Sequence, residues 1–201
     1  MSFQKAHASI VRSIRHVSLL RDWQRARGNH QLPDIAAFIP DERAGDAADL
    51  LMTEIRLADD KPDYICHSAG ERVEQLFDER MSGRLLRECL DQPMANAARP
   101  IWDACVQHML PIYCIVALSD ANGCPVTVEQ IFLPYGRTGG TGPAFMLAAL
   151  HAWSTEGRFA SQGLLRNVRK VPLHWTVMID PALKQKVSST QDVGSDDIVF
   201  G

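Results

Sequence analysis

The stretch DYICHSAGERVEQLFDERMSGRLLRECL, residues 63–90, decides the fold of this chain. Its extended segment, Tyr64 to Ser68, passes into a short amphipathic helix, Glu71 to Phe77. A turn at Ser82-Gly83 then leads into a second helical piece, Arg84 to Leu90. A strand that feeds several short helical turns predicts helices packed over one face of a sheet.

Further strands are expected on both sides of this stretch. Residues 50–57 alternate between apolar and polar side chains, which predicts the first strand. Turn-forming residues follow at 59–62, so the segment 64–68 returns as its hairpin partner. Residues 143–153 fit a helix or a strand, and their position favours a strand. Leu173 to Ile179 alternates again and is a further candidate strand.

A second hairpin is predicted around Asn122-Gly123, the dipeptide most typical of a two-residue loop. In that register Tyr113 faces Phe132 and Ser119 faces Val126. One face then carries Tyr113, Ile115, Ala117, Val126, Val128, Gln130 and Phe132. The other carries Ile112, Cys114, Val116, Leu118, Thr127, Glu129, Ile131 and Leu133. Both faces are too apolar for water, so we expect the domain's helices on one and the first helix or a partner on the other.

The first helix is predicted from about Ala8 to Arg27, where Gly28-Asn29 ends it. Its apolar residues form two stripes: Ile10, Ile14 and Val17 on one side, and Leu19, Trp23 and Ala26 on the other. A helix that is apolar on two sides contacts two surfaces. We therefore predict a homodimer through this helix, with a helix buried in its own core as the alternative.

The central helix is predicted from residue 94 or 95 to 109, ahead of Pro111. Together with the sheet it is expected to enclose a ligand-binding cavity. The predicted lining is Trp102, Cys105 and His108 from the helix and Tyr113, Ile115, Gln130 and Phe132 from the sheet. Mostly apolar walls with a few polar groups suit a small neutral or weakly polar ligand. The alternative is that these residues fill the core and the protein acts only as a docking surface.

Composition and length are those of an ordinary globular protein. The chain has 201 residues, of which 46% are hydrophobic and 22% charged. Its apolar runs are shorter than the roughly 20 residues of a membrane span, and its N-terminus lacks a secretory h-region. We therefore expect a cytoplasmic protein without membrane insertion. The expected division is an N-terminal helix and linker (1–49), a domain with a C-terminal extension (50–183) and a disordered tail (184–201).

Charge is unevenly distributed behind a net value of -3. Residues 1–30 carry six basic residues against one acid, and residues 31–63 carry nine acids against three basic residues. The two segments could pair within one protomer or across two, or the basic helix could meet nucleic acid or anionic lipid. Overall acidity and the lack of stacking aromatics among the arginines argue against a nucleic-acid partner.

Residues suited to catalysis or metal binding do not form a recognisable pattern. The five cysteines are scattered, so neither a disulfide framework nor a metal knuckle is indicated. Cys105 and His108 could meet on one helix face but supply at most two metal ligands. For His108 we favour a hydrogen-bonded core histidine over an axial haem ligand. No catalytic residues and no metal are assigned, and the cofactor is left open.

The order of several short motifs resembles a known family. They are Trp23, Arg27-Gly28, Leu32-Pro33, Glu54, Tyr64, Ala69-Gly70, Leu76-Phe77, Ser82-Gly83 and Leu133-Pro134, within residues 18–153. This block resembles the PAS-like single-domain proteins of alphaproteobacteria, an uncharacterised PAS subfamily. The resemblance implies an α+β fold: a five-stranded antiparallel sheet with helices on one face and an N-terminal capping helix.

The same resemblance implies a non-enzymatic sensory or regulatory role. Such a protein binds a small molecule or a signalling partner and responds through dimer or docking changes. The residues by themselves leave two alternative functions open. One is an enzyme of a cavity-forming α+β fold, with His108 as the evident titratable group. The other is an interaction module with a filled core.

Overall fold

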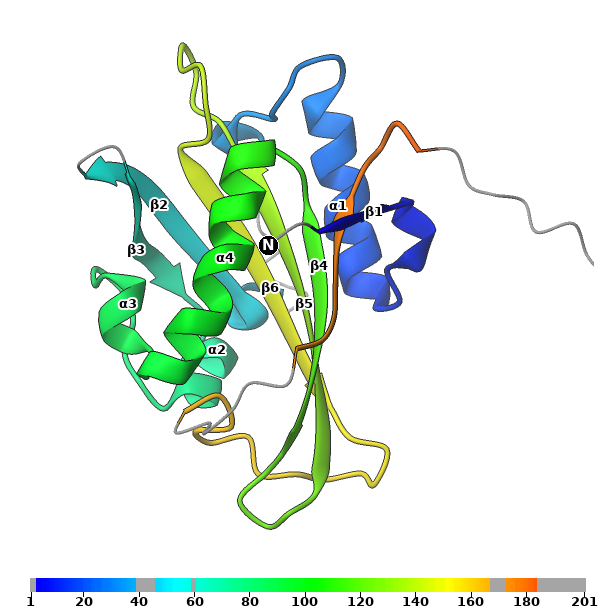
Figure 1. Cartoon of the computed structure of the whole chain (residues 1–201), viewed down its shortest axis with the longest axis vertical. Coiled ribbons are helices and arrows are strands. Elements are labelled where there is room, and N and C mark those ends of the chain that lie inside the picture. The colour runs from blue at the N-terminus through cyan, green and yellow to red at the C-terminus, as the bar shows by residue number, and fades with distance from the viewer. Residues whose placement is uncertain (1–2, 39–45, 59–60, 167–172, 184–201) are drawn as a thin grey trace, which may run out of the picture.

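The computed structural model describes residues 3–38, 46–58, 61–166 and 173–183, and shows a mixed α+β fold around one seven-stranded sheet (Figure 1). The strands are β1 (Gln4–Ala6), β2 (Leu50–Ala58), β3 (Lys61–Ala69), β4 (Ile112–Ser119), β5 (Pro125–Tyr135), β6 (Phe145–Trp153) and β7 (Leu173–Ile179). The helices are α1 (Ile14–Arg27), α2 (Glu71–Phe77), α3 (Leu86–Cys89) and α4 (Gln92–His108). Short 3-10 turns are η1 (Ala8–Ile10), η2 (Ile35–Ala37) and η4 (Asp46–Asp49).

The strands lie in the order β1-β7-β4-β5-β6-β2-β3. Every neighbouring pair is antiparallel except β1 and β7, which are parallel. The five strands predicted between residues 50 and 153 form the antiparallel centre, and the ambiguous segment 143–153 supplies strand β6. The expected number of five strands is wrong, because β7 pairs with the free edge of β4 and β1 then pairs with β7.

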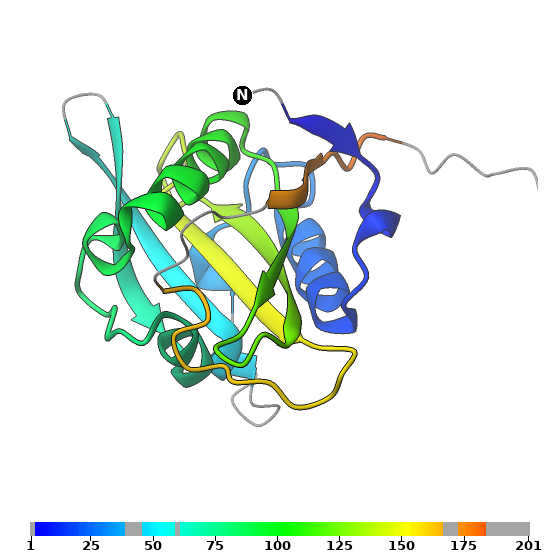
Figure 2. The ribbon, with the colours of Figure 1, turned by 60° about the horizontal axis from the view of Figure 1, so that its bottom comes forward.

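Helices cover both faces of the sheet, with α4 on one side and α1 on the other (Figure 2). This placement agrees with the predicted arrangement of helices on one face and an N-terminal capping helix. The face under α4, α2 and α3 presents Cys114, Val116, Val128, Phe132, Met146, Ala148 and Leu150. The face under α1 presents Tyr113, Ile131, Leu133, Leu147 and Ala149. The expectation that both apolar faces are covered is confirmed, and the first helix of the same chain provides the second cover.

The register of the β4–β5 hairpin differs from the predicted one by one residue. Tyr113 pairs with Ile131 rather than Phe132, and Ser119 pairs with Pro125. The loop is longer than two residues because the Asp120 carboxylate accepts the backbone N–H groups of Asn122 and Cys124, at 2.8 and 2.9 Å. A shift of one residue moves one strand's side chains to the other face relative to its partner.

The helix α1 is shorter at its start than the predicted helix from Ala8. His7 accepts a hydrogen bond from the N–H of Ser9 and caps a separate 3-10 turn, after which Val11 is extended. The buried side of α1 consists of His16, Leu20 and Trp23, spaced as one helix face. Each of the two predicted apolar stripes is only partly buried: Trp23, and in part Val17 and Leu19, pack against the core, whereas Ile14 is 86% exposed.

The helix α4 begins at Asp91, whose carboxylate accepts the N–H of Met94 at 3.0 Å, and it continues through Pro100. Its buried residues include Ile101, Trp102 and Cys105. Towards β3, the Tyr64 hydroxyl donates to the Asp103 carboxylate at 2.6 Å. The helix therefore closes the core between itself and strands β3 to β6.

Gly70, which links β3 to α2, lies so close to the backbone of η4 that only glycine fits there. A Cβ atom at Gly70 would lie 2.1 Å from the carbonyl oxygen of Ala47 and 2.4 Å from that of Ala48. The N–H of Gly70 also donates to the carbonyl of Leu50 at 2.8 Å. Gly70 thus lets η4 pack directly on the end of β3, beside the first turn of α2.

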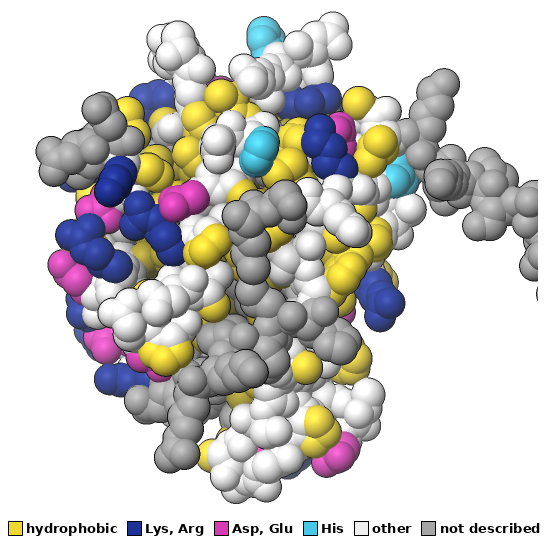
Figure 3. Space-filling model, in the orientation of Figure 1, with side chains coloured by type: hydrophobic (Ala, Val, Ile, Leu, Met, Phe, Trp, Pro, Cys, Tyr) yellow, Lys and Arg dark blue, Asp and Glu magenta, His cyan; other side chains and the backbone are white. Residues whose placement is uncertain are grey.

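Charged side chains of both signs are interspersed on the face that carries α4 (Figure 3). Arg99 pairs there with Asp103 at 2.9 Å. No helix in the described part of the chain is long and apolar enough to cross a membrane. The expected disordered tail from residue 184, and the turn residues 59 and 60, lie outside the described ranges.

Trp23 is the residue by which α1 is held to the sheet. Its side chain is fully buried, and its indole N–H donates to the Pro134 carbonyl at 2.7 Å. We expect Trp23→Ala to lower the free energy of unfolding by about 3–5 kcal/mol in urea denaturation, because it leaves a cavity and an unpaired carbonyl. Trp23→Phe should lower the free energy of unfolding by less, because the smaller aromatic ring leaves a smaller cavity. Arg21→Ala on the exposed side of α1 is the control and should stay within about 0.5 kcal/mol of the parent.

Candidate functional site

The seven residues predicted to line one cavity do not lie together. Trp102, Cys105 and Phe132 are buried on the α4 side, where the Cys105 thiol lies 3.8 Å from the Phe132 carbonyl oxygen. Gln130 shares that side through its pairing with Cys114. Tyr113 and Ile115 instead belong to the cluster on the α1 side. The one-residue difference in register is the cause, because it places the β4 and β5 members of the set on opposite faces.

His108 does not belong to either core. It is the last residue of α4 and its side chain is exposed. The interpretation of His108 as a core histidine is therefore wrong, and its side chain does not reach the buried position expected of a haem ligand. The next residue, Met109, takes a left-handed conformation with φ of 54° and ends the helix.

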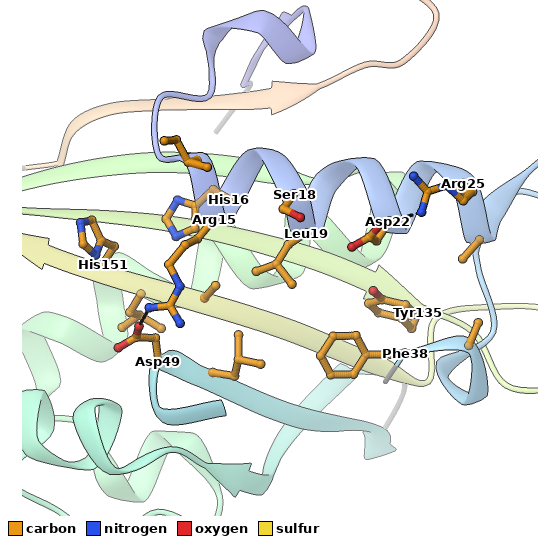
Figure 4. Close-up of a pocket in the computed structure, with 16 residues that line it drawn as sticks. Arg15, His16, Ser18, Leu19, Asp22, Arg25, Phe38, Asp49, Tyr135 and His151 are labelled. Carbon is orange, nitrogen blue, oxygen red and sulfur yellow. Dashed lines mark hydrogen bonds and ion pairs between the residues drawn. The ribbon is translucent and has the colours of Figure 1, made fainter. Parts of the chain in front are cut away.

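An open groove lies on the other face of the sheet, alongside α1 (Figure 4). It has a volume of about 580 Å³, within the range usual for small-molecule sites. Its walls come from one side of α1, from Phe38 and η4, and from β2, β5 and β6 beneath. The lining residues are Ile14, Arg15, His16, Ser18, Leu19, Asp22, Arg25, Ala26, Ala37, Phe38, Asp49, Leu50, Tyr135, Ala149, Leu150 and His151.

One end of the groove is polar. Arg15 on α1 forms an ion pair with Asp49 at the end of η4, and Arg72 on α2 pairs with the same carboxylate. His16 and His151 lie beside this pair (Figure 4). Arg15 belongs to the basic first segment and Asp49 to the acidic second one, so the two segments meet here within one protomer.

His16 is the most unusual residue of the groove. Its side chain is 1% exposed, and Nδ1 is buried without a hydrogen-bond partner among the residues described. Burial is the main reason that the pKa of His16 is lowered to about 4. Glu129 and Asp49 oppose this shift, whereas His151 and Arg15 add to it. His16 is therefore a neutral imidazole near pH 7.

Glu129 lies close enough to His16 to affect its pKa, and two donors hold its carboxylate. The Tyr113 hydroxyl donates to one carboxylate oxygen at 2.7 Å, and the Trp153 indole N–H donates to the other at 3.2 Å. Burial and the Glu129 hydrogen bond raise the pKa of Tyr113, so this hydroxyl keeps its proton. Glu129 pairs across the sheet with His151, which places both residues on the face below α1.

The middle and far end of the groove are different in character. Leu19 points into the middle, and the rings of Phe38 and Tyr135 lie 6.0 Å apart at an angle of 57° (Figure 4). At the far end Arg25 pairs with Asp22 at 3.0 Å. Burial, with a smaller effect of Asp22, raises the pKa of Tyr135. The groove thus has an apolar middle between two ends that carry hydrogen-bonding groups.

No group of three His, Cys, Asp or Glu side chains in the described ranges could hold a metal ion. The two oxygens of Glu129 are already occupied by donors, and the arginines of the groove are paired with carboxylates. The arrangement suits the binding of a small amphipathic molecule.

The sequence did not indicate this groove, although Ile14, Leu19 and Ala26 belong to the two apolar stripes predicted for the first helix. A signal existed for His16, because it shares one helix face with Leu20 and Trp23. Glu129 also stood out as an acid within an apolar strand. Asp49 and Phe38 carried no local signal, because they reach the groove only through the path of the chain between α1 and β2.

Comparison with known proteins gives little further information. No family model matches the chain, and no curated protein matches it. Ten chains of solved structures match. One of them, a substituted form of RsLOV, a LOV domain of the PAS family, has 16% sequence identity and a TM-score of 0.37. The match covers 60% of this chain and 73% of that chain. A likeness of this size is weak and does not show the family.

The buried neutral His16 makes the stability of the fold dependent on pH. In the unfolded chain the pKa is near 6.5, whereas in the folded protein it is about 4. The unfolded state therefore takes up a proton first as the pH falls, and stability is lost between pH 6.5 and 4. We expect the parent protein to lose about 3 kcal/mol more over this window than His16→Leu does.

Urea denaturation at several pH values measures this difference. The comparison with His16→Leu cancels the contributions of the other carboxylates and histidines. Parallel pH profiles for the two proteins would mean that His16 is not buried as a neutral group.

Proposed function

We propose that this chain is a non-enzymatic regulatory domain that binds a small molecule in the groove between α1 and the sheet. The observation that carries the proposal is the groove itself, which combines an apolar middle with a buried, unpaired imidazole nitrogen. An unpaired buried polar atom costs free energy, and a bound molecule that supplies a partner recovers it. The PAS-like order of the sequence motifs supports the same kind of role.

The position of the groove supports regulation through α1. One wall is α1, and the opposite wall is formed by Phe38 and η4. The helix is attached to the sheet chiefly by Trp23 and at its start by the Arg15–Asp49 ion pair. A molecule that contacts both walls stabilises one position of α1 over others, which is how a ligand shifts a conformational equilibrium.

A second copy of the chain is the proposed partner of the outward side of α1. Ile14 is 86% exposed on that side and also lines the mouth of the groove. A dimer contact there would place the partner next to the bound molecule, so that binding and association would affect each other. The homodimer is the one expected from the sequence. Its contact is centred on Ile14, because Trp23 packs inward against the sheet of its own chain.

Ligand binding in the groove is testable with the uncharged fluorescent probe N-phenyl-1-naphthylamine. We expect a saturable rise in fluorescence with the parent protein. Leu19→Trp should weaken binding about tenfold or more, because the larger side chain fills the middle of the groove. Arg21→Trp is the matched control, since it places the same side chain on the exposed side of α1, outside the groove.

Equal binding by the Leu19 and Arg21 variants would place the probe elsewhere. Absence of saturable binding to the parent protein would contradict the proposed function. Circular dichroism of each variant establishes that its fold is retained.

The dimer is tested separately with Ile14→Glu. We expect light scattering to give twice the chain mass for the parent protein and the single chain mass for this variant, because a charge at a buried contact is strongly unfavourable. Ser18→Glu, another exposed position of α1 one turn further on, serves to map the extent of the contact. A single-chain mass for the parent protein over the micromolar range would exclude the homodimer.

A further inference from the structure

The charges around the groove are matched in pairs. Arg15 pairs with Asp49 at one end, and Arg25 pairs with Asp22 at the other. At the Arg15–Asp49 end, where the Asp49 side chain is 13% exposed, an ionic group on a bound molecule would have to displace one member of the pair or remain without a counter-ion. Both outcomes are unfavourable, because removing a charge from water without a partner costs several kcal/mol.

The groups that face the polar end carry charges of both signs, so neither sign of head group meets a net counter-charge there. A carboxylate beside His16 would be repelled by Glu129 and Asp49 as well as attracted by Arg15, and the opposite holds for an ammonium. His151 lies at the same end, and the neutral His16 ring offers no charge of its own. A hydroxyl or amide group needs no counter-ion, and with the ring proton of His16 on Nε2 it supplies the donor that the unpaired Nδ1 lacks.

The length of the groove sets the size of the apolar part. His16 and Asp22 are six residues apart on α1, a separation of about 9 Å along the helix axis. A chain of roughly eight carbon atoms has this length. Leu19 lies between them and faces Phe38 and Tyr135 across the groove (Figure 4). The walls there are apolar and aromatic, which suits the apolar body of a bound molecule.

We propose that the groove is selective for an uncharged amphipathic molecule whose hydroxyl or amide head group bonds to His16 and whose apolar body lies between Leu19 and Phe38. The imidazole turns about its χ2 torsion, which has a broad and shallow preference, to present Nδ1 to the head group. This assignment rests on the proposed function and adds the class of molecule and the position of its head group.

The test uses probes that share one apolar body and differ at one end. They are 1-octanol, octanoate, octylamine and 1-methoxyheptane, each measured by displacement of N-phenyl-1-naphthylamine at pH 7.5. We expect 1-octanol to bind about tenfold more tightly than the two charged probes. It should bind about three- to tenfold more tightly than 1-methoxyheptane, which has similar length but no O–H donor.

The variant His16→Leu tests whether His16 is the residue that bonds to the head group. Its side chain is of similar size and apolar, so the groove keeps its volume while the acceptor is lost. We expect 1-octanol and 1-methoxyheptane to bind this variant equally, because neither finds an acceptor at this position. If this variant is too unstable to measure, the relative affinities of 1-octanol and 1-methoxyheptane for the parent protein still test the proposed hydrogen bond.

The outcomes separate this inference from the proposed function. Leu19-dependent binding of the fluorescent probe with equal affinities for all four head groups would overturn the selectivity and leave the proposed function standing. If octanoate or octylamine bound more tightly than the other three probes, the proposed selectivity for an uncharged head group would be wrong. The groove would then be a site for an ionic ligand. Failure of the fluorescent probe to bind the parent protein would remove both.

Discussion

The packing of α1 on the sheet is the interaction on which the rest of this structure depends. The central strands are apolar on both faces, so a single layer of helices would leave one face in contact with water. Trp23 and Leu20 cover that second face from within the same chain, and the indole N–H satisfies the carbonyl of Pro134. Because one helix is narrower than the sheet, it covers the face incompletely. The groove beside α1 is the part of the sheet that the helix and Phe38 leave open.

This origin explains why the groove combines apolar and polar character. Its floor is an apolar face of the sheet, which contributes Leu50 and Ala149. Its polar end arises where α1 starts, because Arg15 meets Asp49 there and His16 lies close enough to Glu129 for the carboxylate to affect its pKa. Glu129 is compatible with burial only because Tyr113 and Trp153 donate to both of its oxygens. The Nδ1 atom of His16 has no such partner among the residues described, so one buried polar group in the wall of the groove is unsatisfied.

Much of the fold was predictable because its signals are local. Alternation identified the strands β2 and β7, and the Asn122-Gly123 dipeptide located the hairpin that joins β4 to β5. The register of that hairpin was not predictable from the dipeptide, because the Asp120 side chain binds two backbone N–H groups and lengthens the turn. That single residue of difference separated Tyr113 from Phe132 and with it the predicted cavity. The exposure of His108 was not predictable from helical spacing, because His108 lies three and seven residues from the buried Cys105 and Ile101.

The sequence by itself determined which segments become strands and helices, and that both faces of the sheet require a cover. These properties depend on side chains that are near one another along the chain, where periodicity and turn-forming residues act. Only the tertiary structure decided which helix covers which face, where the cover is incomplete and which polar groups meet there. Those outcomes depend on contacts between residues as far apart as Trp23 and Pro134, or His16 and Glu129. Such contacts leave no pattern in the sequence, because they are fixed by the register of the strands and by the path of the loops between them.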